Sequence, residues 1–158
     1  MLPMKTKQLV KIFPPNKPLQ AFAPFIGHWK TVGTHGLIPN TMLHGHTTFK
    51  WHESGAFIVM ESSIEEEVGI PDGLALIGSD DELGTYLMIY YDERGVSRHY
   101  QVGIKDSVVM WHREAPKFSQ RNTLTISEDQ QTISGQGEIC QDGSTWEQDL
   151  NLTYSKES

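Results

Sequence analysis

Residues 25–29 have the sequence Phe25-Ile26-Gly27-His28-Trp29, and from here on the chain is a succession of strand-like segments joined by tight turns. Before this stretch lie four lysines, no acidic residue and several prolines, which interrupt regular structure. A Gly-x-Trp sequence that opens a long series of hairpins indicates a sheet that closes around a pocket. The fold of the whole chain therefore depends on how many strands follow and how they connect.

After Pro24, apolar and polar residues alternate with a period of two, which is typical of strands that bury one face. Because short connections join antiparallel neighbours, these segments form a meander and not a parallel sheet. We expect strands at residues 25–34, 43–53, 56–66, 74–79, 85–92, 96–104, 107–113, 119–127, 131–140 and 144–155.

The connections between these segments contain turn-forming residues. Asp142-Gly143 suits a two-residue type I′ hairpin, because both of its central positions require a positive φ. Asp92-Glu93-Arg94-Gly95 suits a type I turn with Gly95 in the left-handed region. An antiparallel meander exposes two edges unless it closes. We therefore expect an all-β fold, in which about ten strands close into a barrel with room for one small ligand.

The first part of the chain differs from the rest. We expect residues 1–24 to form a leader, followed by the barrel domain at residues 25–158. Asn16 is a candidate cap for one helical turn, with Pro18 in its first positions and Pro24 at its end. The lysines make the leader the one basic patch of an acidic chain. We interpret it as a short helical or irregular arm, or a plug over one end of the barrel, in preference to a partner-binding tail.

Length and charge restrict the functional classes. The chain of 158 residues is long enough for one domain with its own core. Its formal net charge of −7 argues against a nucleic-acid partner or an anionic membrane surface. No apolar run approaches the roughly 20 residues that span a bilayer, and none follows the lysines as a secretory signal would require. We therefore expect a cytoplasmic protein. Cys140, the only cysteine, excludes a disulfide framework and a cysteine-based zinc site.

Several short motifs follow one another in order along the chain. They are Phe25-Ile26-Gly27-His28-Trp29, then Trp51 leading into Gly55-Ala56-Phe57-Ile58, Gly78-Ser79-Asp80, Tyr90-Tyr91-Asp92 through Gly95, and Asp142-Gly143-Ser144-Thr145-Trp146. This ordered set resembles the calycin superfamily, which includes lipocalins, fatty-acid-binding proteins and nitrobindins, and in particular a bacterial lipocalin-like family of unknown function. The resemblance spans residues 25–154. It implies a calycin or lipocalin-like barrel, but no particular ligand.

Within that superfamily, the nitrobindins bind haem through a histidine near the C-terminal strand. The last expected strand here, residues 144–155, contains no histidine. Lys30 and Thr31 directly follow Trp29, where nitrobindins repeat glycine. The resemblance therefore does not carry haem binding over to this chain, and we expect no cofactor.

Two histidines, His44 and His46, lie two residues apart, so a strand places both imidazoles on one face, as in strand-borne metal sites. Leu43, Phe49 and Trp51 occupy the opposite face of the same strand. If that apolar face lines the barrel, the histidines face solvent. We interpret the histidine face as solvated and retain His44 and His46 only as weak candidate metal ligands.

The alternation in residues 96–104 places Arg98 and Tyr100 on the apolar face. An arginine there is costly unless a partner accepts its hydrogen bonds. Arg98-x-Tyr100 resembles, in chemistry but not in position, the arginine and tyrosine with which fatty-acid-binding proteins hold a carboxylate. The alternative partner is Glu61, in an internal ion pair, which is the commoner explanation. The two interpretations are compatible if the ion pair opens onto the cavity.

The candidate ligand-binding residues are Arg98, Tyr100, Glu61, Trp51, Tyr90 and Trp111. We expect Trp29 to seal one end of the barrel. No set of nucleophile, base and orienting group is recognisable, so no catalytic residue is assigned, and Cys140 is expected to be inert. No phosphate loop or dinucleotide motif is present either.

These patterns predict a binding protein for a small amphipathic or anionic molecule. Two alternatives stay open: a calycin-fold enzyme acting on a small substrate, and a haem-binding protein similar to nitrobindins. The outward residues Leu87, Ile89 and Tyr91 form a candidate homodimer surface, if Tyr90 faces inward.

Overall fold

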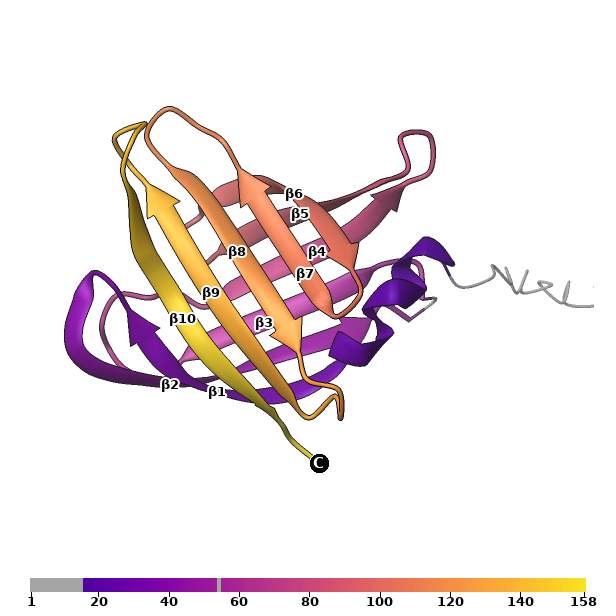
Figure 1. Ribbon diagram of the computed structural model, residues 1–158, viewed down its shortest axis with the longest axis horizontal. Coiled ribbons are helices and arrows are strands. Elements are labelled where there is room, and N and C mark those ends of the chain that lie inside the picture. The colour runs from indigo at the N-terminus through magenta and orange to yellow at the C-terminus, as the bar shows by residue number, and fades with distance from the viewer. Residues whose placement is uncertain (1–15, 54) are drawn as a thin grey trace, which may run out of the picture.

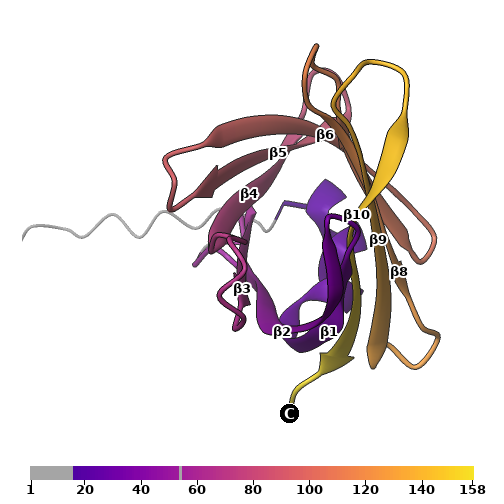
Figure 2. The same ribbon diagram turned by 90° about the vertical axis from the view of Figure 1, so that its left-hand side faces the viewer.

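The computed structural model describes residues 16–53 and 55–158. These residues form a closed antiparallel barrel in which every strand pairs with its neighbours in sequence and β1 pairs with β10 (Figure 1). The strands are β1 (Gly27–His35), β2 (Ile38–Trp51), β3 (Ile58–Ile64), β4 (Gly73–Asp80), β5 (Thr85–Asp92), β6 (Ser97–Lys105), β7 (Val108–Arg113), β8 (Ser119–Ile126), β9 (Thr132–Cys140) and β10 (Trp146–Lys156). The predicted ten-stranded antiparallel barrel is confirmed. Figure 2 shows the strands as a ring.

One of the two turns predicted from the sequence is observed, and the other is not. Gly95 has a φ of +80°, and its N–H donates to the Asp92 carbonyl oxygen over 2.9 Å, as expected for the β5–β6 turn. The prediction of a two-residue hairpin at Asp142-Gly143 is wrong, because β9 ends at Cys140 and β10 begins only at Trp146. The Asp142 carboxylate accepts hydrogen bonds from the backbone N–H groups of the two residues after Gly143, which stabilises a wider loop.

Two strand boundaries also differ from the prediction. β2 begins at Ile38 and not at residue 43, because Gly36 and Leu37 make a tight turn that brings His35 opposite Ile38. β3 begins at Ile58, because residues 55–57 form a bend after β2. This bend decides which residues of β3 face inward, as described for the candidate site below.

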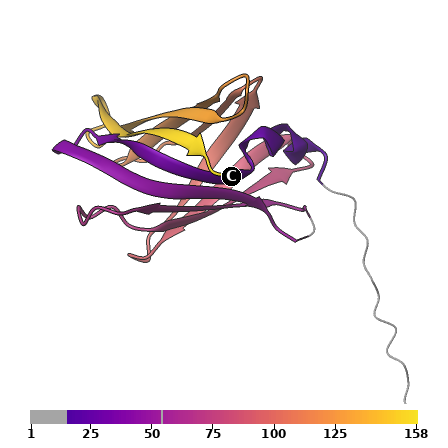
Figure 3. The same ribbon diagram turned by 90° about the horizontal axis from the view of Figure 1, so that it is seen from below.

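One end of the barrel is closed by a 3-10 helix, η1 (Pro18–Phe25). Leu19, Phe22 and Phe25 of this helix are buried, and the Trp29 indole donates to the Phe25 carbonyl oxygen over 2.9 Å. Figure 3 shows η1 and the end of β10 at the same end of the barrel. The predicted short helix near the N-terminus is confirmed. Most of the predicted leader, with its first three lysines, lies outside the described residues.

The residues that the structure describes contain no helix of the length and apolar character that crossing a bilayer requires. From residue 16 onward, the helical structure is η1, which spans eight residues.

The barrel interior has two unlike halves. The half beneath η1 is filled by apolar side chains, and the free space there is only about 10 Å³. The side chains around this space are Phe22, Phe25, Ile26, Phe49, Ile58, Ile77, Val109, Trp111 and Leu124. Close packing of this kind supplies much of the stabilisation of a single-domain fold. Any larger space for a guest therefore lies in the half away from η1.

Leu19 tests the contribution of η1 to stability. Its side chain is fully buried, so Leu19→Ala leaves a cavity and is expected to lower the free energy of unfolding by about 2–5 kcal/mol. Leu83→Ala is the matched control, because Leu83 is 73% exposed. Urea unfolding followed by circular dichroism measures both variants. Equal, near-zero effects of the two substitutions would show that η1 does not contribute to the core.

Candidate functional site

The half of the barrel away from η1 contains a cavity of about 330 Å³. Each of the five loops at that end contributes to its lining. The contributing loop residues are Leu37, Gly69, Ile70, Pro71, Arg94, Phe118 and Gln141. In Figure 1 the β1–β2 and β3–β4 loops lie at the end opposite η1. A smaller space of about 110 Å³ adjoins the cavity and shares Met60, Trp111 and Leu150 with it. The barrel thus has one packed end and one hollow end.

A chain of hydrogen bonds crosses the wall of this cavity and joins four strands. The Tyr100 hydroxyl of β6 donates to Gln120 Oε1 of β8 over 2.5 Å, and Gln120 Nε2 donates to Asp149 Oδ2 of β10 over 2.5 Å. Asp149 Oδ1 lies 2.8 Å from His35 Nε2 of β1. Asp149 is only 7% exposed, so its charge needs these donors.

The state of His35 follows from its second ring nitrogen. The backbone N–H of Leu37 donates to His35 Nδ1 over 3.0 Å, so Nδ1 carries no proton. Nε2 therefore holds the proton of the neutral ring and donates it to Asp149. Both nitrogens of His35 are engaged, and both oxygens of Asp149 accept a hydrogen bond.

Arg98 faces the cavity together with Tyr100, as the alternation in β6 predicts. Its Cζ atom lies 4.0 Å from the centre of the Phe118 ring, which is close enough for a cation–π contact. Among the described residues, the arginines that form ion pairs are Arg94 and Arg121. Arg98 therefore faces the cavity without an ion-pair partner in the part of the chain that the structure describes.

Arg94 lies at the mouth of the same cavity, but its charge is neutralised. Its guanidinium donates to Asp92 Oδ2 over 2.7 Å, and the Tyr90 hydroxyl donates to the same oxygen over 2.9 Å. The Arg94 bonds hold the pKa of Asp92 well below its usual range. Burial and the bond to Asp92 raise the pKa of Tyr90. Tyr90 pairs across strands with Arg98, so a neutral phenol and a free cation lie side by side on the cavity wall.

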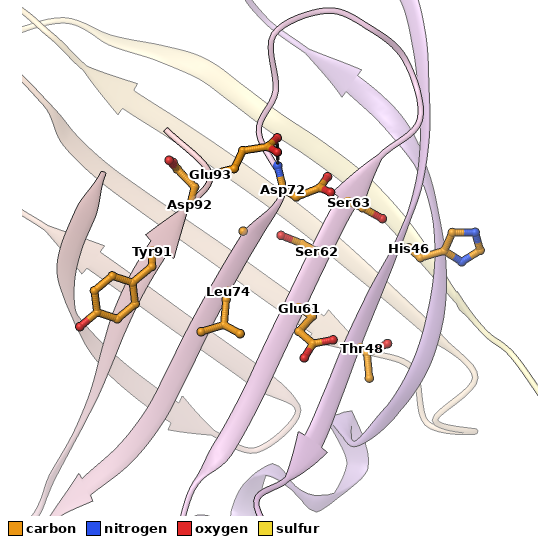
Figure 4. A pocket seen from close by; sticks show the side chains of 11 residues that line it. His46, Thr48, Glu61, Ser62, Ser63, Asp72, Leu74, Tyr91, Asp92 and Glu93 are labelled. Carbon is orange, nitrogen blue, oxygen red and sulfur yellow. Dashed lines mark hydrogen bonds between the residues drawn. The ribbon is translucent and has the colours of Figure 1, made fainter. Parts of the chain in front are cut away.

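The expected ion pair between Arg98 and Glu61 is wrong. Glu61 is exposed on the outer face of the barrel, 3.1 Å from Lys50 Nζ. Figure 4 shows Glu61 of β3, Leu74 of β4 and Tyr91 of β5 on neighbouring strands of one groove. The cause is the bend at residues 55–57. Within β3, Met60 lines the cavity, so Glu61 has to point outward.

The remaining candidates divide between two places. Trp111 and Tyr90 line the cavity with Arg98 and Tyr100. Trp51 packs against the apolar core from the end of β2, and it is not among the residues lining the cavity. The structure therefore brings four of the predicted residues together and separates Glu61 and Trp51 from them.

His44 and His46 lie on the outer face, as predicted, and contact carboxylates there. His44 Nδ1 lies 2.7 Å from Glu66 Oε1, and the His44 backbone N–H donates to the same side chain. His46 lies 3.6 Å from Glu65 and 3.3 Å from Glu157. Within residues 16–53 and 55–158, no cluster of three or more potential ligands has an arrangement suited to a metal ion. Glu66 belongs to the β3–β4 loop, so His44 helps to hold that loop over the cavity.

The outer apolar residues lie as the alternation in β5 predicts. Leu87 is 39% exposed and Tyr91 is 46% exposed, while Tyr90 lines the interior. Ile89 is partly buried on the same outer side.

Comparisons with known proteins give a likeness at the level of fold. No family model matches the sequence, and no curated protein matches it. The chain is similar to the crystal structure of Rv2717c from M. tuberculosis, with a TM-score of 0.66 and 11% sequence identity. The similarity covers 92% of this chain and 100% of the other. At this identity it shows a shared fold alone, in keeping with the closed antiparallel barrel.

Gln120 tests the hydrogen-bonded chain. Gln120→Leu leaves the Tyr100 hydroxyl and the Asp149 carboxylate each without one partner, and is expected to cost about 1–3 kcal/mol of unfolding free energy. The control is Gln101→Leu, because Gln101 is exposed on β6. Thermal and urea unfolding compare the two variants. A Gln120→Leu protein as stable as the control would contradict the role of this chain.

Buried tyrosines predict a loss of stability at alkaline pH. Burial raises the pKa of Tyr100 and of Tyr154, whereas tyrosines of the unfolded chain ionise at about pH 10. The unfolded state then loses protons first, so these groups lower the free energy of unfolding as pH rises above about 10 and leave it unchanged below. Tyr154→Phe should flatten this decline in urea unfolding between pH 8 and 11. An unchanged slope would rule out Tyr154 as a source.

Proposed function

We propose that this chain is a calycin-like binding protein for a small amphipathic anion. The ligand's apolar part occupies the cavity and its anionic group binds the guanidinium of Arg98, beside the Tyr100 phenol. The observation that supports this most is the guanidinium of Arg98, which faces a ligand-sized cavity without a carboxylate partner among the described residues. A partly buried cation of this kind is stabilised when a bound anion compensates it.

The lining of the cavity suits an amphipathic guest. Apolar side chains form much of its wall: Met60, Ala75, Met88, Trp111, Ile139 and Leu150. Polar groups gather near the mouth, where Arg98, Tyr100 and Gln120 converge. The volume of about 330 Å³ lies in the usual range for pockets that hold small molecules.

The charges around the cavity support an anion over a cation. Asp92 neutralises Arg94, and the Asp149 carboxylate is held by two hydrogen bonds from His35 and Gln120 and forms no ion pair with Arg98 among the described residues. Arg98 is left with a charge that draws anions into the open end of a protein whose net charge is −7. An anionic ligand thereby gains a local attraction that the rest of the surface does not offer.

The bonding of His35 supports binding over catalysis. A general base needs a free nitrogen that accepts a proton from the substrate. In His35, Nδ1 accepts from Leu37 and Nε2 donates to Asp149. The dyad therefore orders the wall of the cavity and leaves no nitrogen for proton transfer.

Ligand binding to Arg98→Gln tests this proposal. Decanoate, decanol and decyltrimethylammonium share an apolar tail and differ in charge, so isothermal titration with each isolates the role of the head group. We expect decanoate to bind the wild type best, and Arg98→Gln to weaken it about tenfold or more, as the loss of a charged hydrogen bond implies. The control is Arg121→Gln, since Arg121 is exposed and paired with Glu138 on the outer face.

Two results would contradict the proposal. One is that none of the three amphiphiles binds the folded wild-type protein. The other is that decanoate binds wild type and Arg98→Gln with equal affinity, which would place the anion elsewhere.

A further inference from the structure

The binding of one carboxylate at Arg98 does not explain the position of a second arginine, Arg113. It follows Val109 and Trp111 on the inward face of β7, and its Nε atom is buried without a hydrogen-bond partner in the part of the chain that the structure describes. Like Arg98, it forms no ion pair with any carboxylate of residues 16–53 and 55–158. A buried, unpaired N–H of a guanidinium is costly, so its presence points to an acceptor that binds there.

Arg98 and Arg113 both line a surface hollow beside the cavity, and both lie near the Phe118 ring. Their Cζ atoms are 4.0 Å and 5.9 Å from the centre of the Phe118 ring. Arg113 also pairs across strands with Gln120, the residue that accepts the hydrogen bond from Tyr100. Burial raises the pKa of Tyr100, and the charges of Arg98 and Arg113 oppose that rise, as expected if both lie near the phenol. Two cations, one phenol and one aromatic ring thus surround one small region.

The charge of this region sets the charge of its ligand. Arg98 and Arg113 contribute two positive charges without a carboxylate partner among residues 16–53 and 55–158. Two carboxylates lie nearby. Asp149 accepts hydrogen bonds from the neutral side chains of His35 and Gln120, and Glu114 lines the same hollow as Arg113. Within the described residues, neither carboxylate forms an ion pair with Arg98 or Arg113. A carboxylate ligand would balance only one of the two guanidinium groups. A tetrahedral dianion has enough charge and enough acceptor oxygens for both.

We propose that Arg98 and Arg113 form a clamp for the phosphate monoester head of an amphipathic ligand whose tail fills the cavity. This inference rests on the proposed function and narrows its ligand class. The clamp residues come from the adjacent strands β6 and β7, with the Tyr100 phenol beside them.

The wall of the barrel opens next to this clamp. Pairing between β6 and β7 ends at Gln101 and His112, although β6 extends back to Ser97 and β7 on to Arg113. A surface hollow at this place is lined by Arg98, Tyr100, Arg113 and Glu114, and the first two of these also line the cavity. Arg98 is therefore reached from the cavity and from solvent, and Arg113 from the hollow. A phosphate bound there keeps part of its hydration, which lowers the cost of burying a double charge.

The decisive comparison is between decyl phosphate and decyl sulfate at pH 8, below the concentrations at which they form micelles. Both heads are tetrahedral, but the phosphate monoester is a dianion above its second pKa near about 6, whereas the sulfate carries a single charge. We expect wild-type protein to bind decyl phosphate about tenfold or more tightly than decyl sulfate, because two charged groups contact it. Inorganic phosphate, which has no tail, should compete with decyl phosphate far more weakly.

Variants of Arg113 assign that preference to the clamp. Arg113→Gln should abolish the preference for phosphate while changing decyl sulfate binding by less than about threefold, and Arg113→Lys should retain part of it. Arg121→Gln, on the outer face, should behave as wild type. Circular dichroism confirms that each variant is folded. If Arg113→Gln does not fold, the clamp is tested by the preference of the wild type for decyl phosphate and by the partial loss of that preference in Arg113→Lys.

The outcomes separate this inference from the proposed function. If wild type binds decyl phosphate and decyl sulfate equally, or if folded Arg113→Gln keeps the preference, the clamp is wrong and anion binding at Arg98 stands. If inorganic phosphate competes as well as decyl phosphate, the tail contributes nothing and the proposed ligand class is wrong. If neither amphiphile nor decanoate binds the folded wild type, the proposed function itself fails.

Discussion

The pairing of β1 with β10 is the contact on which the rest of the structure depends. It runs from Trp29 opposite Lys156 to His35 opposite Leu150, and it joins the first strand of the meander to the last. Without it, a ten-stranded sheet would expose two long edges and could not enclose a core. The same seam places Trp29 beneath η1 and brings His35 to Asp149, so closure and the ordering of the cavity wall have one origin.

The period-two alternation predicted the number, order and antiparallel pairing of the strands, because a closed meander keeps one face of every strand buried. It also placed Arg98 and Tyr100 inward, since β6 is regular. It failed for Glu61, where the bend at residues 55–57 shifts the phase between the preceding apolar residues and β3. Local turn chemistry was less decisive, because the Asp142 side chain can stabilise a loop wider than the hairpin that Asp-Gly favours.

The polar chain in the cavity shows what a single sequence leaves hidden. Gln120, Asp149 and His35 meet through pairings between distant segments, which no local pattern specifies. The inward position of Asp149 was hidden for a further reason. The register of β10 against β9 shifts between Gln148 and Asn151, so Asp149 points inward although it is out of phase with the buried residues that follow it. Arg113 could have been found, because the alternation of β7 sets it in line with two buried apolar residues.

The division of the barrel into a packed end and a hollow end has a consequence for how such a protein diverges. Folding relies on the apolar contacts around η1, whereas the polar side chains sit on the loops and strand ends at the far rim. Under the proposed function, substitutions at that rim would change the bound ligand and leave the scaffold intact. Relatives that bind unrelated ligands would then be expected to share the packed end and to differ at the hollow end, even where their sequence identity is no higher than chance.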